Sequence, residues 1–476
     1  MVKADNLGDV PVPEFRRQLH QLADWMADYR ENIETRRVAP IGKPGTVTRA
    51  LPQSAPETGE SFDAIYRDID ELITPNVLHW GHPRFTSYFG ATTTAPGIEA
   101  DMVAAALNVN AMTWRTSPAA TELETVIINW LREWMTLEEK FGGVVYDTAS
   151  ISSMHALAAA REEKASNARE LGVIGRADLK PMRVYVSDQA HSSIEKAAIA
   201  LGIGEKNVQR VPTDDCFAMN VEALREFIAR DLAQNLQPLA VVATVGTTST
   251  ASVDPVSAIA QVCREHGIWL HIDAAYGGGL AILPEERWVT SGWNEADSFV
   301  VNPHKMLFVP FDFSVLYVRD IERLRRVFTL VPEYLRGDTL AAEKNYMDYG
   351  VQLGRRFRAI KAWMVWRTFG REGIAARIRE HMRLAKLFGQ WVKDDARFEL
   401  AAPIVMGVVC FRFAGDDASN RAIVESINTS GRAYLNVTEL RGRAVIRVGL
   451  GNILTTERHL SEVWQSIRDA AASVAK

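Results

Sequence analysis

Two short segments hold the side chains whose types and positions best suit catalysis. Asp273 ends the apolar run WLHID, and Lys305 follows a second apolar run in SFVVNPHK. A carboxylate at the carboxyl end of a strand can pair with a cationic ring nitrogen and keep it protonated, because opposite charges stabilise each other's ionised forms. A lysine that is shielded from water loses its proton more readily, and its free amine can form an imine with an aldehyde. Either residue alone is more often a charge at the end of a loop, so the interpretation depends on finding both.

Metal binding is an alternative use of the polar residues near these segments. His79 and His82 have the spacing HxxH, but no HExxH motif or third ligand accompanies them, so we expect no metal ion. His271 and Asp273 lie two positions apart on an expected strand and therefore face the same side. We interpret His271 as a residue that steadies Asp273 rather than as a metal ligand.

The elements that must position these side chains alternate between strands and helices. Short β-rich runs occur at residues 184–187, 239–245, 269–274, 298–301 and 314–318, with helical stretches between them. Before these runs, Ser117 and Pro118 indicate a helix start, since serine caps helices and proline fits the first helical position. The alternation predicts an α/β fold with a mostly parallel sheet.

The pattern differs at both ends of the chain. Residues 13–30 predict an amphipathic helix whose apolar stripe needs a partner surface, and residues 38–60 are an extended connector rich in proline and glycine. Near the carboxyl end, strand-like segments such as VVCFRF and AVIRVGLG stand beside amphipathic helices. We therefore expect an N-terminal helical and extended dimerisation segment (1–85), a large α/β domain (86–375) and a small C-terminal α+β domain (376–476).

Composition and charge exclude several classes of partner and location. The formal charge of the 476 residues is 54 − 59 = −5, so we expect no binding to nucleic acid or to an anionic membrane. The chain starts without a basic-then-apolar signal segment, and it lacks the run of about 18 apolar residues that a membrane helix needs. Cys216, Cys263 and Cys410 lie far apart and match no CxxC pattern, which suits a reducing compartment. We expect a cytoplasmic protein.

A series of sequence blocks, in one order along nearly the whole chain, resembles a known family. The blocks are LPQSAPETGE (51–60), HWGHPRFTSYF (79–89), WRTSPAATELE (114–124), DTAS (147–150), DQAHSSIEKAA (188–198), ATVGTTSTASVDP (243–255), WLHIDAAYGG (269–278), NPHK (302–305) and QLGRRFRAIKAW (352–363). They are similar to the group II pyridoxal-phosphate-dependent decarboxylases, which include aromatic-L-amino-acid, histidine and plant tryptophan and tyrosine decarboxylases. The resemblance implies the fold type I transferase fold of aspartate aminotransferase, with pyridoxal 5'-phosphate as cofactor.

The resemblance also implies roles for individual residues. Lys305 matches the lysine that holds the cofactor as a Schiff base, and Asp273 matches the partner of its pyridinium nitrogen. His191 matches the histidine that stacks on the cofactor ring and faces the substrate carboxylate. The remaining cofactor contacts match Thr148, Ala149, Ser150, Thr248, Asn302 and His304. Thr148 and Ser150 could instead be ordinary helix caps, and His304 could merely order its loop.

The implied substrate is an aromatic L-amino acid, namely tryptophan, tyrosine, phenylalanine or dopa, which loses carbon dioxide to give an amine. The matching side-chain pocket consists of Trp80, Tyr88, Phe89, Asn110, Met112 and Gly354. Asn110 replaces a bulky apolar residue of the animal enzymes and Met112 replaces a phenylalanine, so the sequence does not support a preference for dopa. Gly354 resembles the small residue of plant members that take indoles, which weakly favours tryptophan.

Two alternatives to a simple decarboxylase remain open. The first is an aldehyde synthase on the same scaffold, and Tyr334, which matches the tyrosine of the family's catalytic loop, favours decarboxylation. The second is a non-catalytic dimeric binding protein, against which the joint presence of Lys305, Asp273 and His191 argues. Family members share pocket residues across a dimer, so the resemblance implies a homodimer with composite active sites.

Overall fold

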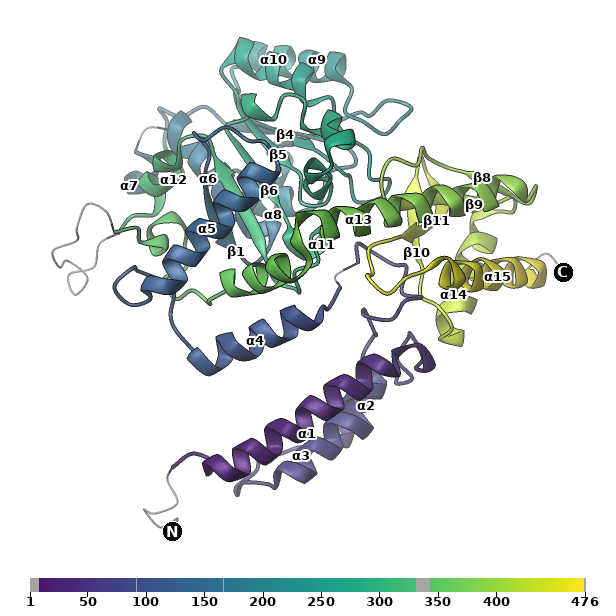
Figure 1. Ribbon diagram of the computed structural model, residues 1–476. Helices are drawn as coiled ribbons and strands as arrows, with labels where there is room; N and C mark the ends of the chain where they lie inside the picture. Colours follow the sequence, from purple (N-terminus) through teal and green to yellow (C-terminus); the bar gives the residue numbers. More distant parts are fainter. Residues whose placement is uncertain (1–7, 91, 166, 331–342, 475–476) are drawn as a thin grey trace. The chain divides into compact units, whose positions relative to one another are not determined.

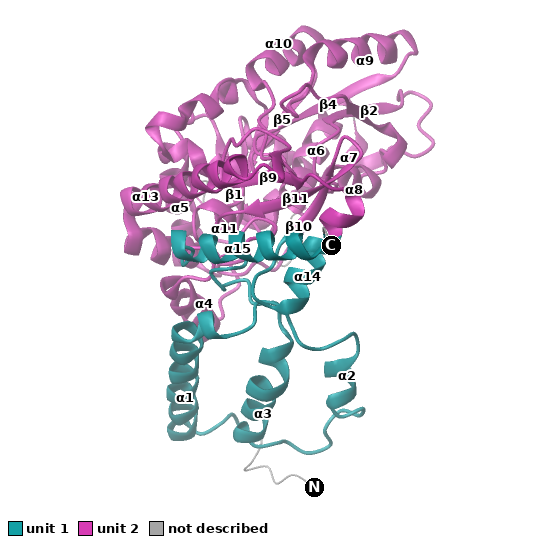
Figure 2. Ribbon diagram, turned by 90° about the vertical axis from the view of Figure 1, so that its right-hand side faces the viewer, with its two compact units in different colours: residues 1–85, 422–435, 454–476 teal, residues 86–421, 436–453 magenta. Residues whose placement is uncertain are grey.

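Figure 1 shows the computed structural model, which describes residues 8–90, 92–165, 167–330 and 343–474. The chain divides into two compact units, which Figure 2 distinguishes by colour. The smaller unit comprises residues 1–85, 422–435 and 454–476, and the larger comprises residues 86–421 and 436–453. Lys305, Asp273 and His191 all belong to the larger unit.

The larger unit contains a seven-stranded sheet with the strand order β1-β7-β6-β5-β4-β2-β3. Strand β7 runs antiparallel to both neighbours, and the other neighbouring pairs are parallel. The strands are β1 (Gly142–Tyr146), β2 (Met182–Ser187), β3 (Val208–Val211), β4 (Gln237–Thr244), β5 (Trp269–Asp273), β6 (Ser298–Val301) and β7 (Ser314–Val318). The predicted α/β class and mostly parallel sheet are confirmed. Strands β1 and β3 were not predicted, because β1 begins with two glycines and polar residues fill the middle of β3 (VQRV).

Helices pack against this sheet, so its central strands are buried and apolar on both faces. Every residue of β5 is buried, and so is every residue of β4 after the first. Helix α6 packs against β4, β5, β6 and β7, whereas α9 and α10 pack against β4 (Figure 1). These and the neighbouring helices are α4 (Ala95–Leu107), α5 (Pro118–Trp134), α6 (Ala149–Lys164), α7 (Ala168–Leu171), α8 (Ser193–Ala200), α9 (Val221–Ala233), α10 (Val256–His266), α11 (Pro303–Met306) and α12 (Ile321–Phe328).

A second, antiparallel sheet has the strand order β10-β11-β9-β8. Its strands are β8 (Phe398–Leu400), β9 (Val408–Phe413), β10 (Asn436–Leu440) and β11 (Arg443–Gly449), where strand-like segments were predicted. Helix α13 (Ala359–Asp394; Figure 1) packs on α4 and α5 as well as on β8 and β9. Its backbone departs from helical geometry at Gly370. The expected boundary between residues 375 and 376 falls inside α13, and the three-segment division stays a prediction.

The smaller unit contains α1 (Val12–Glu31), α2 (Thr46–Ala50), α3 (Phe62–Asp68) and α15 (Glu457–Val474), whereas α14 (Asp417–Ser430) belongs to both units. Helix α1 covers the predicted amphipathic stretch, yet none of its residues is buried, and Phe15 is 51% exposed. Among the described residues, no helix is both long enough and apolar enough to span a membrane.

Candidate active site

A cavity of about 190 Å³ lies where the carboxyl ends of β4, β5 and β6 meet the loops that follow them. Ligands of open α/β sheets bind at this end of the strands, where loop side chains converge. The cavity is lined by Phe89, Thr148, Ala149, Ser150, His191, Ser193, Thr244, Gly246, Thr248, Asp273, Ala275, Tyr276, Asn302, His304 and Lys305. It therefore brings together Phe89 and every described residue for which the sequence predicted a catalytic or cofactor-binding role.

Lys305 presents its amine to the cavity from the single-turn helix α11, which follows β6. Its Nζ lies 4.9 Å from the centre of the Phe89 ring. Burial lowers the pKa of Lys305, the carboxylate of Asp273 opposes this shift, and the guanidinium of Arg447 reinforces it. The lowered pKa increases the fraction of free amine, which is the form that attacks a carbonyl carbon.

Asp273 and His191 provide a buried carboxylate and a neutral imidazole in the same cavity. Asp273 is the last residue of β5, is 6% exposed, and accepts a hydrogen bond from the backbone N–H of Ala275 (3.1 Å). The backbone N–H of Ser193 donates to Nδ1 of His191 (3.2 Å). Burial lowers the pKa of His191, so the ring is neutral near pH 7 and carries its proton on Nε2.

Several backbone and side-chain donors in the lining suit an anion. Thr148 precedes the first turn of α6 and makes no side-chain cap hydrogen bond, so the backbone N–H groups of this turn have no side-chain acceptor there. The backbone N–H of Phe313 donates to Nδ1 of His304 (2.9 Å), and burial lowers the pKa of His304 to about 3. His304 is therefore neutral, with Nε2–H as its free donor. Thr244 Oγ1 and Asn302 Oδ1 are buried and have no hydrogen-bond partner within the described chain.

The residues predicted to form the substrate pocket do not all lie at one place in this chain. Phe89 lines the cavity and stacks on Tyr276, with ring centres 3.8 Å apart. Asn110 and Met112 form a separate cluster beside residue 354, in which Asn110 Nδ2 donates to Met112 Sδ (3.5 Å). A Cβ atom at Gly354 would lie 3.9 Å from Asn110 Nδ2. None of these three residues lines the cavity.

The other predicted substrate and catalytic positions have different locations. Tyr88 is 47% exposed next to Phe89 in the larger unit. Trp80 belongs to the smaller unit, where its ring lies 4.7 Å from that of Phe85. Tyr334 lies outside the described residues.

His271 does not support Asp273 as the sequence suggested. Its Nδ1 is hydrogen-bonded to Ser298 (2.9 Å) and its Nε2 to Ser153 (3.0 Å), so both ring nitrogens are occupied. Burial lowers the pKa of His271 to about 4, which keeps the ring neutral. The interpretation was wrong about the partner, because His271 lies opposite Ser298 on the neighbouring strand β6. His271 instead links β5 to β6 and to α6.

Arg447 is a site residue that the sequence argument missed. It is 4% exposed on β11, and its guanidinium carbon lies 4.9 Å from the centre of the Phe89 ring. Its Nη1 donates to the carbonyl oxygen of Tyr88 (2.6 Å) and its Nε to that of Ser249 (3.0 Å). An arginine inside the apolar run AVIRVGLG was the signal that could have identified it, because buried charges need specific partners.

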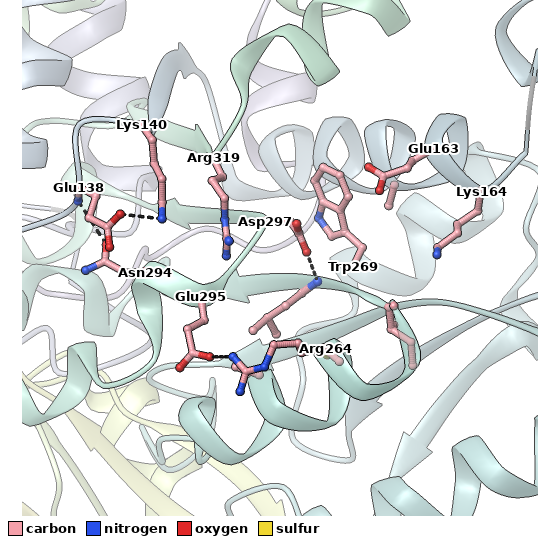
Figure 3. Close-up of a pocket in the computed structure, with 16 residues that line it drawn as sticks. Glu138, Lys140, Glu163, Lys164, Arg264, Trp269, Asn294, Glu295, Asp297 and Arg319 are labelled. Carbon is pink, nitrogen blue, oxygen red and sulfur yellow. Dashed lines mark hydrogen bonds and ion pairs between the residues drawn. The ribbon is translucent and has the colours of Figure 1, made fainter.

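A larger cavity of about 530 Å³ lies near the amino end of β5 (Figure 3). Several charged side chains around it have partners, including Lys140 with Glu138 (2.6 Å) and Arg264 with Glu295 (Figure 3). Asp297 accepts a hydrogen bond from the backbone N–H of Leu270 (2.9 Å). These contacts indicate a polar crevice rather than a catalytic site.

Metal binding finds no support in the part of the chain that the structure describes. No group of three or more His, Cys, Asp or Glu side chains there is placed to hold a metal ion. His79 of the HxxH pair is hydrogen-bonded through Nδ1 to the hydroxyl of Tyr29 (2.8 Å).

Known proteins match the chain over nearly its whole length. The model of the pyridoxal-dependent decarboxylase conserved domain matches residues 44–414. An aromatic-L-amino-acid decarboxylase of Bos taurus is 40% identical over 97% of this chain and 96% of its own. A phenylacetaldehyde synthase of Arabidopsis thaliana is 37% identical over 96% of this chain and 94% of its own length. The structure of Oryza sativa TDC with PLP and tryptamine superposes with a TM-score of 0.94, at 34% identity, over 99% of this chain and 100% of that one.

Proposed function

The chain belongs to the pyridoxal-dependent decarboxylase family, and from that premise we propose that it decarboxylates an aromatic L-amino acid to the corresponding amine and carbon dioxide. The observation that carries the proposal is the convergence of Lys305, Asp273 and His191 on one cavity at the carboxyl ends of the strands. A relative that is 40% identical along its length is an aromatic-L-amino-acid decarboxylase.

Pyridoxal 5'-phosphate is the cofactor of this family, and the residues of the cavity fit it. The phosphate would accept hydrogen bonds from the first turn of α6 at Ala149 and Ser150 and from Nε2–H of His304. The buried side-chain oxygens of Thr244 and Asn302, which have no hydrogen-bond partner among the described residues, would gain partners from a polar ligand. When bound, the cofactor supplies an electron-accepting ring, which takes up the electron pair that departing carbon dioxide leaves.

The chain's own residues would then perform three tasks. Lys305 would hold the cofactor through its amine, because the lowered pKa of this lysine favours the unprotonated, nucleophilic form. The carboxylate of Asp273 keeps a proton on the ring nitrogen, since a negative charge beside that nitrogen stabilises its cationic form. His191, whose Nδ1 accepts the backbone N–H of Ser193, would present its Nε2–H inside the cavity and hold the substrate carboxylate there.

The experiment that tests this function measures amine and carbon dioxide from a panel of L-tryptophan, L-tyrosine, L-phenylalanine and L-dopa. The purified protein should show a visible cofactor absorbance band and should release equal amounts of amine and carbon dioxide from at least one panel member. A protein that binds the cofactor but releases no amine from any of the four would contradict the proposal. The panel also tests the weak preference for tryptophan that Gly354 suggests.

An aromatic aldehyde synthase is a second candidate, because the Arabidopsis relative with 37% identity has that activity in its name. Tyr334 distinguishes the two, since a phenol can donate the proton that Cα needs after carbon dioxide leaves. Tyr334→Phe should retain cofactor and substrate binding, lose most amine formation, and yield aldehyde, ammonia and peroxide under air. Equal amine output from the variant and the wild type, without aldehyde or peroxide, would assign this proton to another group.

A homodimer with composite active sites is part of the proposal. The cluster of Asn110, Met112 and Gly354 does not line the cavity of its own chain, and it could complete the cavity of a second copy. Apolar side chains are exposed on two helices: Val12 and Phe15 on α1, and Met102, Val103 and Leu107 on α4. Sedimentation should therefore detect a dimer, and a fully active monomer would contradict this part of the proposal.

We place the protein in the cytoplasm. Its three cysteines are free thiols, two of them buried, as expected for a protein in a reducing compartment. Fractionation of cells that express the tagged chain should recover it with the cytosolic proteins.

A further inference from the structure

Two residues that face each other in the small sheet hold the backbone of Tyr88 from both sides. Asn436 on β10 and Arg447 on β11 are paired across the two strands. The backbone N–H of Tyr88 donates to Oδ1 of Asn436 (2.6 Å), and the carbonyl oxygen of Tyr88 accepts from Nη1 of Arg447 (2.6 Å). The hydroxyl of Ser87, which is fully buried, also donates to Oδ1 of Asn436. The side-chain oxygen of Asn436 thus accepts hydrogen bonds from two successive residues, Ser87 and Tyr88.

The segment needs such support because Tyr88 has an unfavourable backbone conformation. Its φ is +52°, in the left-handed region, where a Cβ atom crowds the following carbonyl. A residue other than glycine keeps this conformation only where the surroundings impose it. Gly449 permits the close approach of the sheet, since a Cβ atom there would lie 2.4 Å from the Tyr88 carbonyl oxygen.

The conformation of Tyr88 determines where the next side chain lies. Phe89 stacks on Tyr276 and lies below the amine of Lys305, inside the cavity. If Tyr88 relaxed to an extended conformation, the chain would change direction just before Phe89. The ring would then leave both contacts.

We propose that Asn436 is a positioning residue, which keeps Tyr88 left-handed and thereby places the Phe89 ring beside Lys305 to receive the aromatic substrate. This inference rests on the proposed function for its substrate, but the position of Phe89 can be measured without turnover. Asn436 itself does not line the cavity. It acts through the backbone of the neighbouring segment.

Asn436→Val tests the role, because valine is of similar size and suits a strand but has no acceptor oxygen. We expect KM for the aromatic substrate to rise about tenfold with a smaller change in kcat, as for the loss of the two hydrogen bonds that Oδ1 of Asn436 accepts from Ser87 and Tyr88. The visible circular dichroism of the bound cofactor should change as well, because an aromatic ring beside Lys305 has moved. Asn436→Asp retains an acceptor oxygen and should restore most of both properties.

Asn420→Val is the matched control, since Asn420, a buried asparagine, likewise accepts a hydrogen bond from a backbone N–H, that of Phe413 (2.9 Å). It should lower the melting temperature without changing KM or the dichroism. If it does not fold, Glu439→Val at an exposed position of β10 replaces it.

Unchanged KM and dichroism in folded Asn436→Val would overturn the proposal. So would an Asn436→Asp variant that behaves like Asn436→Val. If the wild type forms no amine at all, the proposed function fails, and the dichroism of the bound cofactor still decides whether Asn436 positions Phe89.

Discussion

The two ends of β5 show why the size of a cavity does not identify an active site. At the amino end, the crevice beside Trp269 has about 530 Å³, whereas the cavity beside Asp273 at the carboxyl end has about 190 Å³. The charges Lys140 and Arg264 around the larger cavity have carboxylate partners. Around the smaller cavity, the half-buried Lys305 lies near Asp273 and has a lowered pKa, and the buried side-chain oxygens of Thr244 and Asn302 have no partner in the described chain.

The difference reflects what each end of a parallel strand offers. Loops at the carboxyl ends lead into helix amino termini such as that of α6, where backbone N–H groups point toward the cavity. Loops at the amino ends follow helix carboxyl termini, whose free groups are carbonyls. The carboxyl end therefore attracts an anionic ligand, whereas paired surface charges at the amino end contribute little beyond solubility.

Of the paired substitutions at the two ends of β5, replacement of Lys305 and its control should differ most in amine formation. Among the described residues, Lys305 is the only lysine that lines the smaller cavity, so in Lys305→Ala amine formation should fall below detection and borohydride should no longer fix the cofactor to the chain. Lys164→Ala at the larger cavity is the matched control and should keep normal turnover. Near-normal activity of Lys305→Ala after borohydride treatment and dialysis would show that another lysine reacts.

Asp273→Asn should have the next largest effect. The substitution keeps the shape of the side chain and removes the charge that would stabilise the protonated ring nitrogen, so kcat/KM should fall by at least about 100-fold. Asp297→Asn is the control, because Asp297 bonds to Leu270 N and to Arg323 (3.2 Å) at the other end. It should lower stability and leave kcat/KM nearly unchanged. Equal losses of kcat/KM in both variants would contradict the claim that only the carboxylate at the carboxyl end of β5 contributes to catalysis.

The sequence predicted the Lys305 cavity because parallel strands place their carboxyl ends together. Asp273 and Lys305 each follow an apolar run, so the α/β pattern alone brings them to one side of the sheet. The remaining contacts depend on register, which a sequence pattern does not specify. His271 bonds to Ser298 because these residues are neighbours across β5 and β6, and Asn436 meets Arg447 across β10 and β11.

The substrate pocket was predicted less completely for a different reason. The resemblance identified Asn110 and Gly354 by their positions in the sequence, but not whether one chain would bring them to its own cavity. The backbone N–H of Arg355 donates to Oδ1 of Asn110 (2.9 Å), which holds this cluster together away from the cavity. Long-range contacts of this kind link residues far apart in the chain, and local periodicity carries no information about them.

Stability should fall in mild acid because of buried neutral histidines. Burial lowers the pKa of each below the unfolded value of about 6.5, so the unfolded chain binds more protons as the pH falls through this range. Stability should be full above about pH 6.5 and should fall progressively down to about pH 4. Urea unfolding at several pH values measures this, and constant stability between pH 7 and 5 would contradict it. The pKa is lowered to about 4 for His82, His155, His271 and His381, and to about 3 for His304.

The smallest predicted effect on kcat/KM tests whether a change at the amino end of β5 affects catalysis at its carboxyl end. Trp269 borders the larger cavity, and its Nε1 donates to Ser298 Oγ (2.9 Å), which also bonds His271. Trp269→Phe removes this donor while Ser298 keeps its bond to His271, so the free energy of unfolding should fall by about 1 kcal/mol. Since His271 has no hydrogen bond to Asp273, kcat/KM should stay within a factor of about two, which corresponds to less than 0.5 kcal/mol.

Trp288→Phe is the matched control, because its Nε1 donates to Glu286 (2.7 Å) at a side chain that is 51% exposed. It should change neither stability nor turnover, since a solvent-exposed hydrogen bond is readily replaced by water. A tenfold loss of kcat/KM in Trp269→Phe alone would mean that the chain of hydrogen bonds through Ser298 and His271 positions the catalytic end. The larger cavity would then influence catalysis from the amino end of the strand.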